Sequence, residues 1–486
     1  MNVRRSTLSP TDKKLTDGQY SFRWQNIDWH KAERVVNNLQ SRITKAALSN
    51  QWHLVKKLQY LLTHSYSARL LSIRRVTSNR GKRTAGIDGE LWLTPESKMQ
   101  AVFRLISKGY KAKPLRRVFI AKVGKNTKRA LGIPTLHDRA MQSLYALSLE
   151  PVAEATGDFR SFGFRKYRSP KDCREQAFSC LSRKSSPHWV LECDIKGCFD
   201  NINHQWLLKH ISMDKAILSQ FLRAGFVYKH HLYPTKAGTP QVGIISPILA
   251  NMALDGIEAL LMSRYPKCPT SSSKVNFIRY ADDAIVTAAS EGIAKEIKAL
   301  LSDFFSKRGL ELSAEKTLIT NINEGFDFLG WNFRKYNGKL LIKPSNQSIK
   351  KFIENVRRTI YKGRSWSQDA LICKLNPIIR GWVNYHKSSV SSRIFRQLDS
   401  IIWGMLWTWS KRRHPDKSKH WIANKYWKES PTRNWTFQTQ ENNLLLMSHT
   451  KIRRHVPLKL YMNPFLNQDY FQKRKNRLKL NNLSAI

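Results

Sequence analysis

The sequence predicts an α+β fold with an appended helical domain, and three observations support this prediction. Two apolar segments rich in strand-forming residues predict strands, one at about 189–195 and a hairpin at about 276–288. Segments with helical periodicity lie between and after them, and the clearest is the amphipathic stretch 291–308. From about residue 347 the pattern is helical and strongly basic. Strands that alternate with helices and then give way to helices indicate α+β architecture followed by a helical domain.

The N-terminal part divides into two regions. Residues 1–25 are polar and lack periodicity, so we expect a flexible leader. Residues 26–85 carry apolar side chains at helical spacing, for example Leu54, Leu58 and Leu61, which predicts a helical N-terminal extension.

Residues 86–345 form the expected α+β unit. A strand is predicted at 115–122, and its partner begins near residue 128. The loop between them, 123–127, contains Gly and Lys and is therefore basic. A hairpin of this kind can fold over phosphate groups.

We expect the remaining chain to divide into a helical domain at 346–429 and a basic region at 430–486. Six tryptophans between Trp403 and Trp435 alternate with Lys and Arg. Tryptophans in such a pattern occur more often in a core than as platforms for stacked bases, but the cations between them favour RNA binding.

Composition narrows the choice of partner. The 486 residues include 41% apolar side chains, and 84 Lys and Arg exceed 35 Asp and Glu to give a net charge of +49. No apolar run approaches the length of a membrane span, so nucleic acid is the expected anionic partner. Six cysteines without a Cys-x-x-Cys pair indicate a reducing compartment.

Three aspartates form the candidate catalytic site. Asp282 and Asp283 are adjacent at the expected apex of a hairpin with apolar strands on both sides, and Asp194 ends the strand at 189–195. Like charges beside a core are costly unless cations neutralise them, and Mg²⁺ prefers carboxylate and phosphate oxygens. The alternative for Asp282 and Asp283 is a solvated turn.

These residues resemble the palm motifs of reverse transcriptases in order and spacing. The resemblance is carried by Tyr280-Ala281-Asp282-Asp283, by Asp194 with Phe199 five residues later, and by Gln241 within Thr239-Pro240-Gln241-Val242-Gly243. Residues 375–386 and 407–427 further resemble the maturase, or thumb, domain of group II intron-encoded proteins. The resemblance covers most of the chain, from about Trp29 to Phe471.

The resemblance implies a right-hand polymerase with fingers, palm and thumb that copies RNA into DNA and helps its own intron RNA to splice. Two Mg²⁺ ions, with Mn²⁺ as a substitute, would activate the primer hydroxyl and stabilise the pyrophosphate. The implied metal ligands are Asp194, Asp282 and Asp283, with Lys316 as general acid. The implied substrate-binding residues are Lys122, Arg129, Phe199 and Gln241, and the expected nucleic-acid contacts are Arg380, Lys411, Arg412, Arg413 and Lys425.

Several alternatives stay open. Lys316 has the alternative of an exposed loop lysine, and Phe199 that of a core residue rather than a gate against ribose. The sequence also departs from the family pattern at Val242, Ala130 and Cys193. Val242 stands where the family usually has Gly, and its β-branched side chain could crowd the template or the nucleotide. None of these changes removes a required charge.

The expected partners are group II intron RNA, a DNA target and dNTPs, without a membrane, in a monomer or a dimer. We expect a bacterial, nucleoid-associated cytoplasmic ribonucleoprotein; an organelle is the alternative, although no transit peptide is evident. Beyond residue 435 the histidines are His449 and His455 and there is no cysteine, so we expect no His-Asn-His endonuclease domain. The alternative functions are a splicing-only maturase on a decayed polymerase fold and a domesticated or defence-associated reverse transcriptase.

Overall fold

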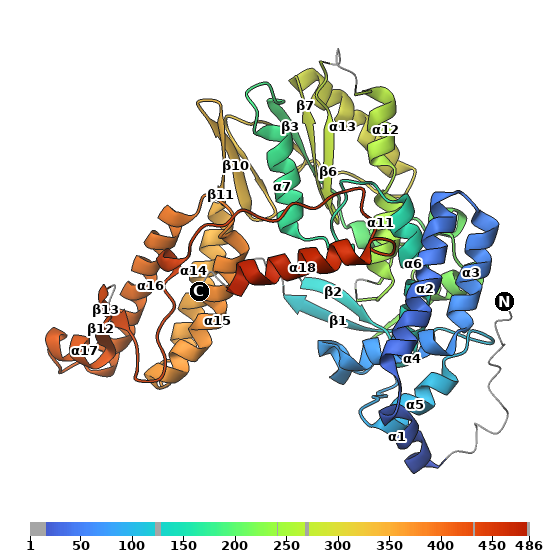
Figure 1. Ribbon diagram of the computed structural model, residues 1–486, viewed down its shortest axis with the longest axis horizontal. Coiled ribbons are helices and arrows are strands. Elements are labelled where there is room, and N and C mark those ends of the chain that lie inside the picture. Colours follow the sequence, from blue (N-terminus) through green and yellow to red (C-terminus); the bar gives the residue numbers. More distant parts are fainter. Residues whose placement is uncertain (1–15, 122–127, 241, 268–271, 431–432, 484–486) are drawn as a thin grey trace.

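The structure is a computed structural model that describes residues 16–121, 128–240, 242–267, 272–430 and 433–483. It confirms the α+β fold with a right-hand arrangement, in which a palm sheet lies between N-terminal helices on one side and thumb helices on the other (Figure 1). No helix among the described residues is long and apolar enough to cross a membrane.

The N-terminal extension is helical, as expected, but it begins earlier than the sequence indicated. Its helices are α1 (Asp17–Gln25), α2 (Trp29–Leu48), α3 (Trp52–His64) and α4 (Tyr66–Ser78). The prediction of a flexible leader to residue 25 was therefore wrong for the residues of α1. Thr16 and Gln19 form a capping box that satisfies the first amide groups of α1, a local signal that the hydrophobic pattern did not reveal.

The fingers contain the predicted hairpin. Strands β1 (Leu115–Ala121) and β2 (Lys128–Ile133) pair antiparallel, and β1 also pairs with β4 (Phe226–Tyr228), which forms a second hairpin with β5 (His231–Tyr233). The sheet order is β2-β1-β4-β5, and helix α5 (Pro95–Arg104) precedes it. The sequence did not indicate the β4–β5 hairpin, because each of its strands has only three residues.

The palm sheet has the order β6-β7-β3-β8. Its strands are β3 (Trp189–Asp194), β6 (Asn276–Tyr280), β7 (Asp283–Ala288) and β8 (Leu318–Asn321). The palm helices are α6 (Leu136–Thr156), α7 (Pro170–Leu181), α8 (Cys198–Asn201), α9 (His204–His210), α10 (Lys215–Arg223), α11 (Ser246–Leu254), α12 (Ile257–Arg264) and α13 (Glu291–Ser306).

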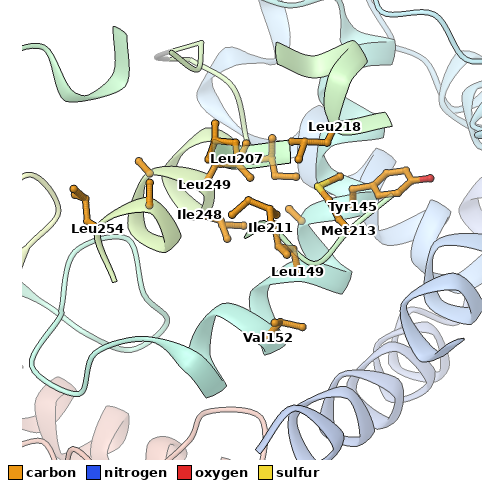
Figure 2. Packing of buried hydrophobic residues seen from close by; sticks show 14 of the residues in the cluster. Tyr145, Leu149, Val152, Leu207, Ile211, Met213, Leu218, Ile248, Leu249 and Leu254 are labelled. Atoms are coloured by element: carbon orange, nitrogen blue, oxygen red, sulfur yellow. The ribbon is translucent and has the colours of Figure 1, made fainter. Parts of the chain in front are cut away.

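Side chains from α6, α9, α10 and α11 form part of a continuous apolar core. Figure 2 shows Leu149 and Val152 of α6 on one side and Leu207 of α9, Leu218 of α10 and Leu249 on the other. Burial of these side chains fixes the helices that carry the loops of the site, since each large aliphatic side chain contributes about 2 kcal/mol when it leaves water.

A three-stranded sheet connects the palm to the thumb. It consists of β9 (Phe326–Phe328), β10 (Trp331–Tyr336) and β11 (Lys339–Pro344). The thumb follows with α14 (Asn346–Lys362), α15 (Gln368–His386), α16 (Ser392–Arg413), α17 (Lys419–Tyr426), β12 (Trp427–Ser430) and β13 (Arg433–Phe437). The expected boundary between residues 429 and 430 falls inside the β12–β13 hairpin, and Phe437, Leu444 and Met447 belong to the thumb core.

After the thumb the chain returns to the palm. A short 3-10 helix (Met447–His449) is followed by an extended segment and by α18 (Gln468–Leu483) (Figure 1). The Phe471 ring stacks on Tyr167 with centroids 5.0 Å apart, and Arg474 pairs with Asp172 of α7. The last part of the chain thus packs on the palm.

Candidate active site

A tight turn presents two of the predicted aspartates. Tyr280 of β6 pairs with Asp283 of β7, so Ala281 and Asp282 alone form the turn between the strands. Ala281 has a φ of 57°, a left-handed conformation that a non-glycine residue seldom adopts. The fold therefore holds the Asp282 carboxylate at the tip of a strained hairpin.

The third aspartate lies directly opposite. Asp194 ends β3 and pairs with Asp283 in the antiparallel register, which places two like charges on neighbouring strands. Burial and the nearby charges of Asp282 and Asp194 together raise the pKa of Asp283 to about 6, although Lys316 acts in the opposite direction. The fold therefore brings carboxylates together where burial and repulsion destabilise their ionised forms.

Lys316 lies at this cluster. Its Nζ atom is 3.0 Å from Oδ2 of Asp194, and the turn that carries it is fixed because the Ser313 amide donates to the Asp194 carbonyl oxygen at 2.8 Å. The Lys316 side chain remains 57% exposed. Lys316 is therefore both a counter-charge for Asp194 and accessible to a substrate.

The donor set fits divalent cations that prefer oxygen. In the part of the chain that the structure describes, no three His, Cys, Asp or Glu side chains converge closely enough to ligate one ion as they stand. Asp194 here accepts from Lys316 instead. Mg²⁺ sites with one or two protein carboxylates are usually completed by substrate phosphates and water, so the three carboxylates are compatible with ions that enter together with a nucleotide.

A buried arginine supports the turn from beneath. Arg279 of β6 is 1% exposed and pairs with Asp255. Its guanidinium donates to Oδ1 of Asn251 at 3.1 Å and to the carbonyl oxygen of Ala281 at 3.2 Å. A buried charge with this many partners holds one geometry, and here that geometry includes the turn that carries Asp282.

A neighbouring loop supports the turn from the side. The Asn251 amide donates to the Gly163 carbonyl oxygen at 2.8 Å, and a Cβ atom at Gly163 would lie 2.2 Å from the Ala281 nitrogen. Only glycine permits that approach. Arg165 and Arg168, which follow in the same loop, both pair with the buried Glu154 and so anchor the loop to α6.

No sequence motif predicted a role in the site for Arg279, Asn251 or Gly163. Local signals for them exist. Arg279 is a charged residue inside an apolar strand, and Asn251 is a polar residue inside the apolar helix α11. A polar residue in an apolar element needs buried partners, but the sequence alone does not identify those partners.

A pocket of about 540 Å³ lies between the palm and the fingers sheet. Phe199, Arg117 and Phe119 line it, together with residues of the β4–β5 hairpin. Phe199 is partly buried, and its ring forms a T-shaped pair with the exposed Phe164 ring, with centroids 6.1 Å apart. The pocket is large enough for a nucleotide base and sugar, and an aromatic ring faces it at the predicted position.

The other predicted substrate-binding residues are only partly described. Lys122 and Gln241 lie outside the described residues. Arg129 is exposed on β2, opposite Ile120 of β1. Of the three departures from the family pattern, Ala130 lines the pocket, Val242 is exposed and Cys193 is buried.

The predicted nucleic-acid contacts fall into two groups. Arg380, Lys411 and Arg412 are exposed on the thumb helices α15 and α16. Arg413 has a structural role as well, because its guanidinium donates to the carbonyl oxygens of Arg364 and Trp366 and lies 4.7 Å from the Trp409 ring centroid.

Lys425, the fifth predicted contact, lies 4.7 Å from the ring centroid of the exposed Trp421. Some of the thumb tryptophans lie in the core and others lie on the surface. Trp409 and Trp427 are buried in the thumb core, whereas Trp421 and Trp435 are exposed. The thumb therefore combines an aromatic core with a cationic surface.

Three family profiles match consecutive parts of the chain. Residues 24–105 match the N-terminal domain of reverse transcriptase, residues 120–333 match reverse transcriptase (RNA-dependent DNA polymerase), and residues 349–427 match the group II intron, maturase-specific domain.

Curated relatives agree with these profiles. The group II intron-encoded protein LtrA of Lactococcus lactis subsp. cremoris is 27% identical over 447 residues, which cover 73% of each chain. Maturase-like protein 1 of Euglena gracilis is 29% identical, covering 76% of this chain and 79% of its own length. Among solved structures, a telomerase from Candida albicans in complex with telomeric RNA aligns over 65% of each chain, with 12% identity and a TM-score of 0.35.

Proposed function

The chain belongs to the reverse transcriptases of group II introns, and from this premise we propose that it binds its intron RNA, assists the splicing of that RNA and copies it into DNA. It is an RNA-directed DNA polymerase by family. The observation that carries the mechanistic proposal is the register of the palm sheet, which sets Asp194 opposite Asp283 and leaves Asp282 in the adjoining turn.

The three aspartates would hold two divalent cations, Mg²⁺ with Mn²⁺ as a substitute. Such ions, when bound, lower the pKa of a primer hydroxyl and stabilise charge on the leaving pyrophosphate. The protein contributes the position of the carboxylates, because the buried partners of Arg279 fix the turn before any substrate arrives. Lys316, with its ammonium already at the carboxylate cluster, would donate a proton from Nζ to the pyrophosphate.

The pocket between palm and fingers would receive the incoming dNTP. Phe199 on its wall would pack beneath the sugar and exclude a 2′-hydroxyl. The basic residues Lys122 and Arg129 would grip the triphosphate from the fingers, and Gln241 would lie over the nascent base pair. These roles rest on the match to the family's motifs.

The thumb would bind intron RNA. Its exposed Arg380, Lys411, Arg412 and Lys425 supply positive charge on a rigid helical scaffold, which suits recognition of RNA duplexes and loops through their phosphates. We assign the basic residues that follow the thumb core, from 450 onward, to a DNA target, because the expected start at residue 430 falls inside the β12–β13 hairpin of the thumb. The complex of the protein with its intron RNA would act on bacterial DNA. The intron would move to new DNA sites because the protein copies its RNA into DNA.

Two assays on one preparation test the proposal. Purified protein should extend a DNA primer on an RNA template with dNTPs and Mg²⁺ or Mn²⁺, and it should accelerate splicing of the intron RNA that surrounds its reading frame. Splicing without any extension would identify a maturase on an inactive polymerase fold. Extension without any effect on splicing would identify a polymerase that does not assist splicing.

A further inference from the structure

Helix α7 of the palm lies where the palm meets the thumb, between the palm sheet and the connecting sheet β9–β11 (Figure 1). Its buried Cys173 belongs to one apolar cluster with Ile278 of β6 and Ile285 of β7, the strands on either side of the catalytic turn. Tyr385 of the thumb helix α15 packs against the same cluster. Helix α7 is therefore held to the strands that present the catalytic aspartates, and it also lies next to the thumb.

Two cations of α7 reach across to the thumb. The Nζ atom of Lys171 donates to the Asn384 carbonyl oxygen at 2.6 Å, and Nη1 of Arg174 donates to the Ser388 carbonyl oxygen. Asn384 lies in the last turn of α15 and Ser388 just beyond it, where carbonyl groups without an intrahelical partner carry partial negative charge. Both cations therefore attach a palm helix to the end of a thumb helix.

The surroundings of the two cations show that their role is to bridge. Nη2 of Arg174 pairs with Glu175 of its own helix at 2.9 Å, so the charge is compensated inside α7 while Nη1 is directed to the thumb. Only 4% of the Arg174 side chain is exposed, so water cannot readily replace the lost partner if the bridge breaks. Lys171 lies in the first turn of α7, where the helix dipole disfavours a cation, and the carbonyl of the thumb offsets that cost.

Other hydrogen bonds attach the thumb to the connecting sheet. The Tyr385 hydroxyl donates to the Leu329 carbonyl oxygen at 2.9 Å, and the Val390 amide donates to that of Ile342 at 2.8 Å. These bonds do not involve the sheet that carries the aspartates. The bridges from α7 are what tie the thumb to the same body as the catalytic turn.

We propose that Lys171 and Arg174 are positioning residues that set the angle between the thumb and the catalytic turn, and thereby the number of nucleotides added before the duplex is released. A right-hand polymerase holds the duplex product with its thumb while the palm acts at the primer end, so both must fit one rigid duplex at once. A looser bridge leaves each addition intact and favours release between additions. The inference rests on the polymerase activity and goes beyond it by assigning residues to processivity.

The test uses Lys171→Met and Arg174→Met, which remove the bridging donors and keep an unbranched side chain, and Arg174→Lys, which keeps a donor. Each Met variant has a matched control inside the palm. Lys215 and Arg308 also donate to backbone carbonyl oxygens, at 2.5 Å and 2.8 Å, but their acceptors belong to the palm. Lys215→Met and Arg308→Met therefore lose the same kind of hydrogen bond without loosening the thumb. Thermal unfolding is compared within each pair.

Three quantities are measured for each protein. Single-turnover kinetics give the rate of one nucleotide addition, and extension in the presence of a trap for released enzyme gives the length added per binding event. The distance between palm and thumb is measured without substrate, by spin labels on the exposed Cys373 of α15 and on a cysteine introduced at the exposed Ser302 of α13. Cys268 is changed to Ser in all of these proteins.

Both bridge variants should shorten the length added per binding event about tenfold, as expected for the loss of one hydrogen bond from a charged donor, while the rate of one addition matches that of the controls. They should also broaden the distribution of palm–thumb distances, and Arg174→Lys should restore part of both properties. Lengths or distances equal to those of the controls would overturn the proposal. A matching loss in the rate of one addition would also overturn it, because the effect would then lie at the active site. A wild type that extends no primer would contradict the polymerase activity itself, and the distances would still show whether α7 positions the thumb.

Discussion

The palm and the thumb use charge in opposite ways. In the palm, Asp194, Asp282 and Asp283 concentrate negative charge in one turn and one strand end, and buried groups such as Arg279 hold them in place. In the thumb, cations such as Lys411 and Arg412 are spread over exposed helix faces. The palm site depends on where a few charges lie, whereas the thumb surface depends on how many charges it carries.

This difference predicts how each region responds to mutation. A change of one charge in the palm alters the site where bonds are made, whereas one charge removed from a surface of net charge +49 alters the total very little. Catalysis and RNA affinity should therefore be separable by single and multiple substitutions.

The largest effect is expected from Asp282→Asn. Loss of this carboxylate should reduce primer extension about a thousandfold or more, because a preorganised charge at the reacting atoms is removed. RNA affinity should not change. Asp303→Asn, an exposed aspartate on α13, is the matched control. Robust synthesis by the Asp282→Asn protein would show that this residue is not part of the active site.

Gly163→Ala tests the support of the catalytic turn. The added Cβ atom would collide with the Ala281 nitrogen, so the turn must shift, and extension should slow about a hundredfold with RNA binding intact. Gly18→Ala is the control, because its Cβ would meet nothing within 4 Å. Single-turnover extension measures the effect, and a rate equal to that of the control would mean that the turn tolerates displacement.

The double change Lys411→Gln with Arg412→Gln tests the thumb surface. The slope of RNA affinity against salt should fall by about two units, since two phosphate contacts are lost, while extension on a simple template stays near wild type. Arg413 should be kept, because its hydrogen bonds to two carbonyl oxygens stabilise the thumb. Equal loss of binding and extension would argue against separate surfaces.

Phe199→Val tests the sugar gate. A smaller side chain should leave room for a 2′-hydroxyl and improve the use of ribonucleotides about tenfold relative to dNTPs. Ile202→Val, which shortens a fully buried side chain in the same segment, controls for loss of packing. Discrimination that stays the same in both variants would assign Phe199 to the core.

The smallest effect concerns a buried palm carboxylate outside the site. Burial, with the charge of Asp255 nearby, raises the pKa of Asp158 to about 6, so the folded state binds this proton more tightly than the unfolded chain does. Its contribution to stability therefore falls as pH rises from about 4 to about 6. Asp158→Asn should raise the unfolding midpoint at pH 7 and not at pH 4. A midpoint unchanged at pH 7 would refute this.

The sequence predicted the elements whose signal is local. The strands that end in Asp194 and begin at Asp283 have apolar patterns of strand length, and both form as expected. The contacts of Arg279 with Asn251, and of Gly163 with Ala281, join residues far apart in the chain. Hydrophobic periodicity gives no information on such pairings.

The three-carboxylate site can be tested without an extension assay or a splicing assay. When Fe²⁺ replaces Mg²⁺, hydroxyl radicals formed in the presence of a reductant and peroxide cut the polypeptide beside the bound ion. With primer, template and dNTP present, the wild type should be cut near Asp194 and near Asp282, and excess Mg²⁺ should suppress both cuts. The Asp282→Asn protein should lose them while it still binds the template. Cutting elsewhere in the chain, or equal cutting in the mutant, would contradict a metal site formed by Asp194, Asp282 and Asp283.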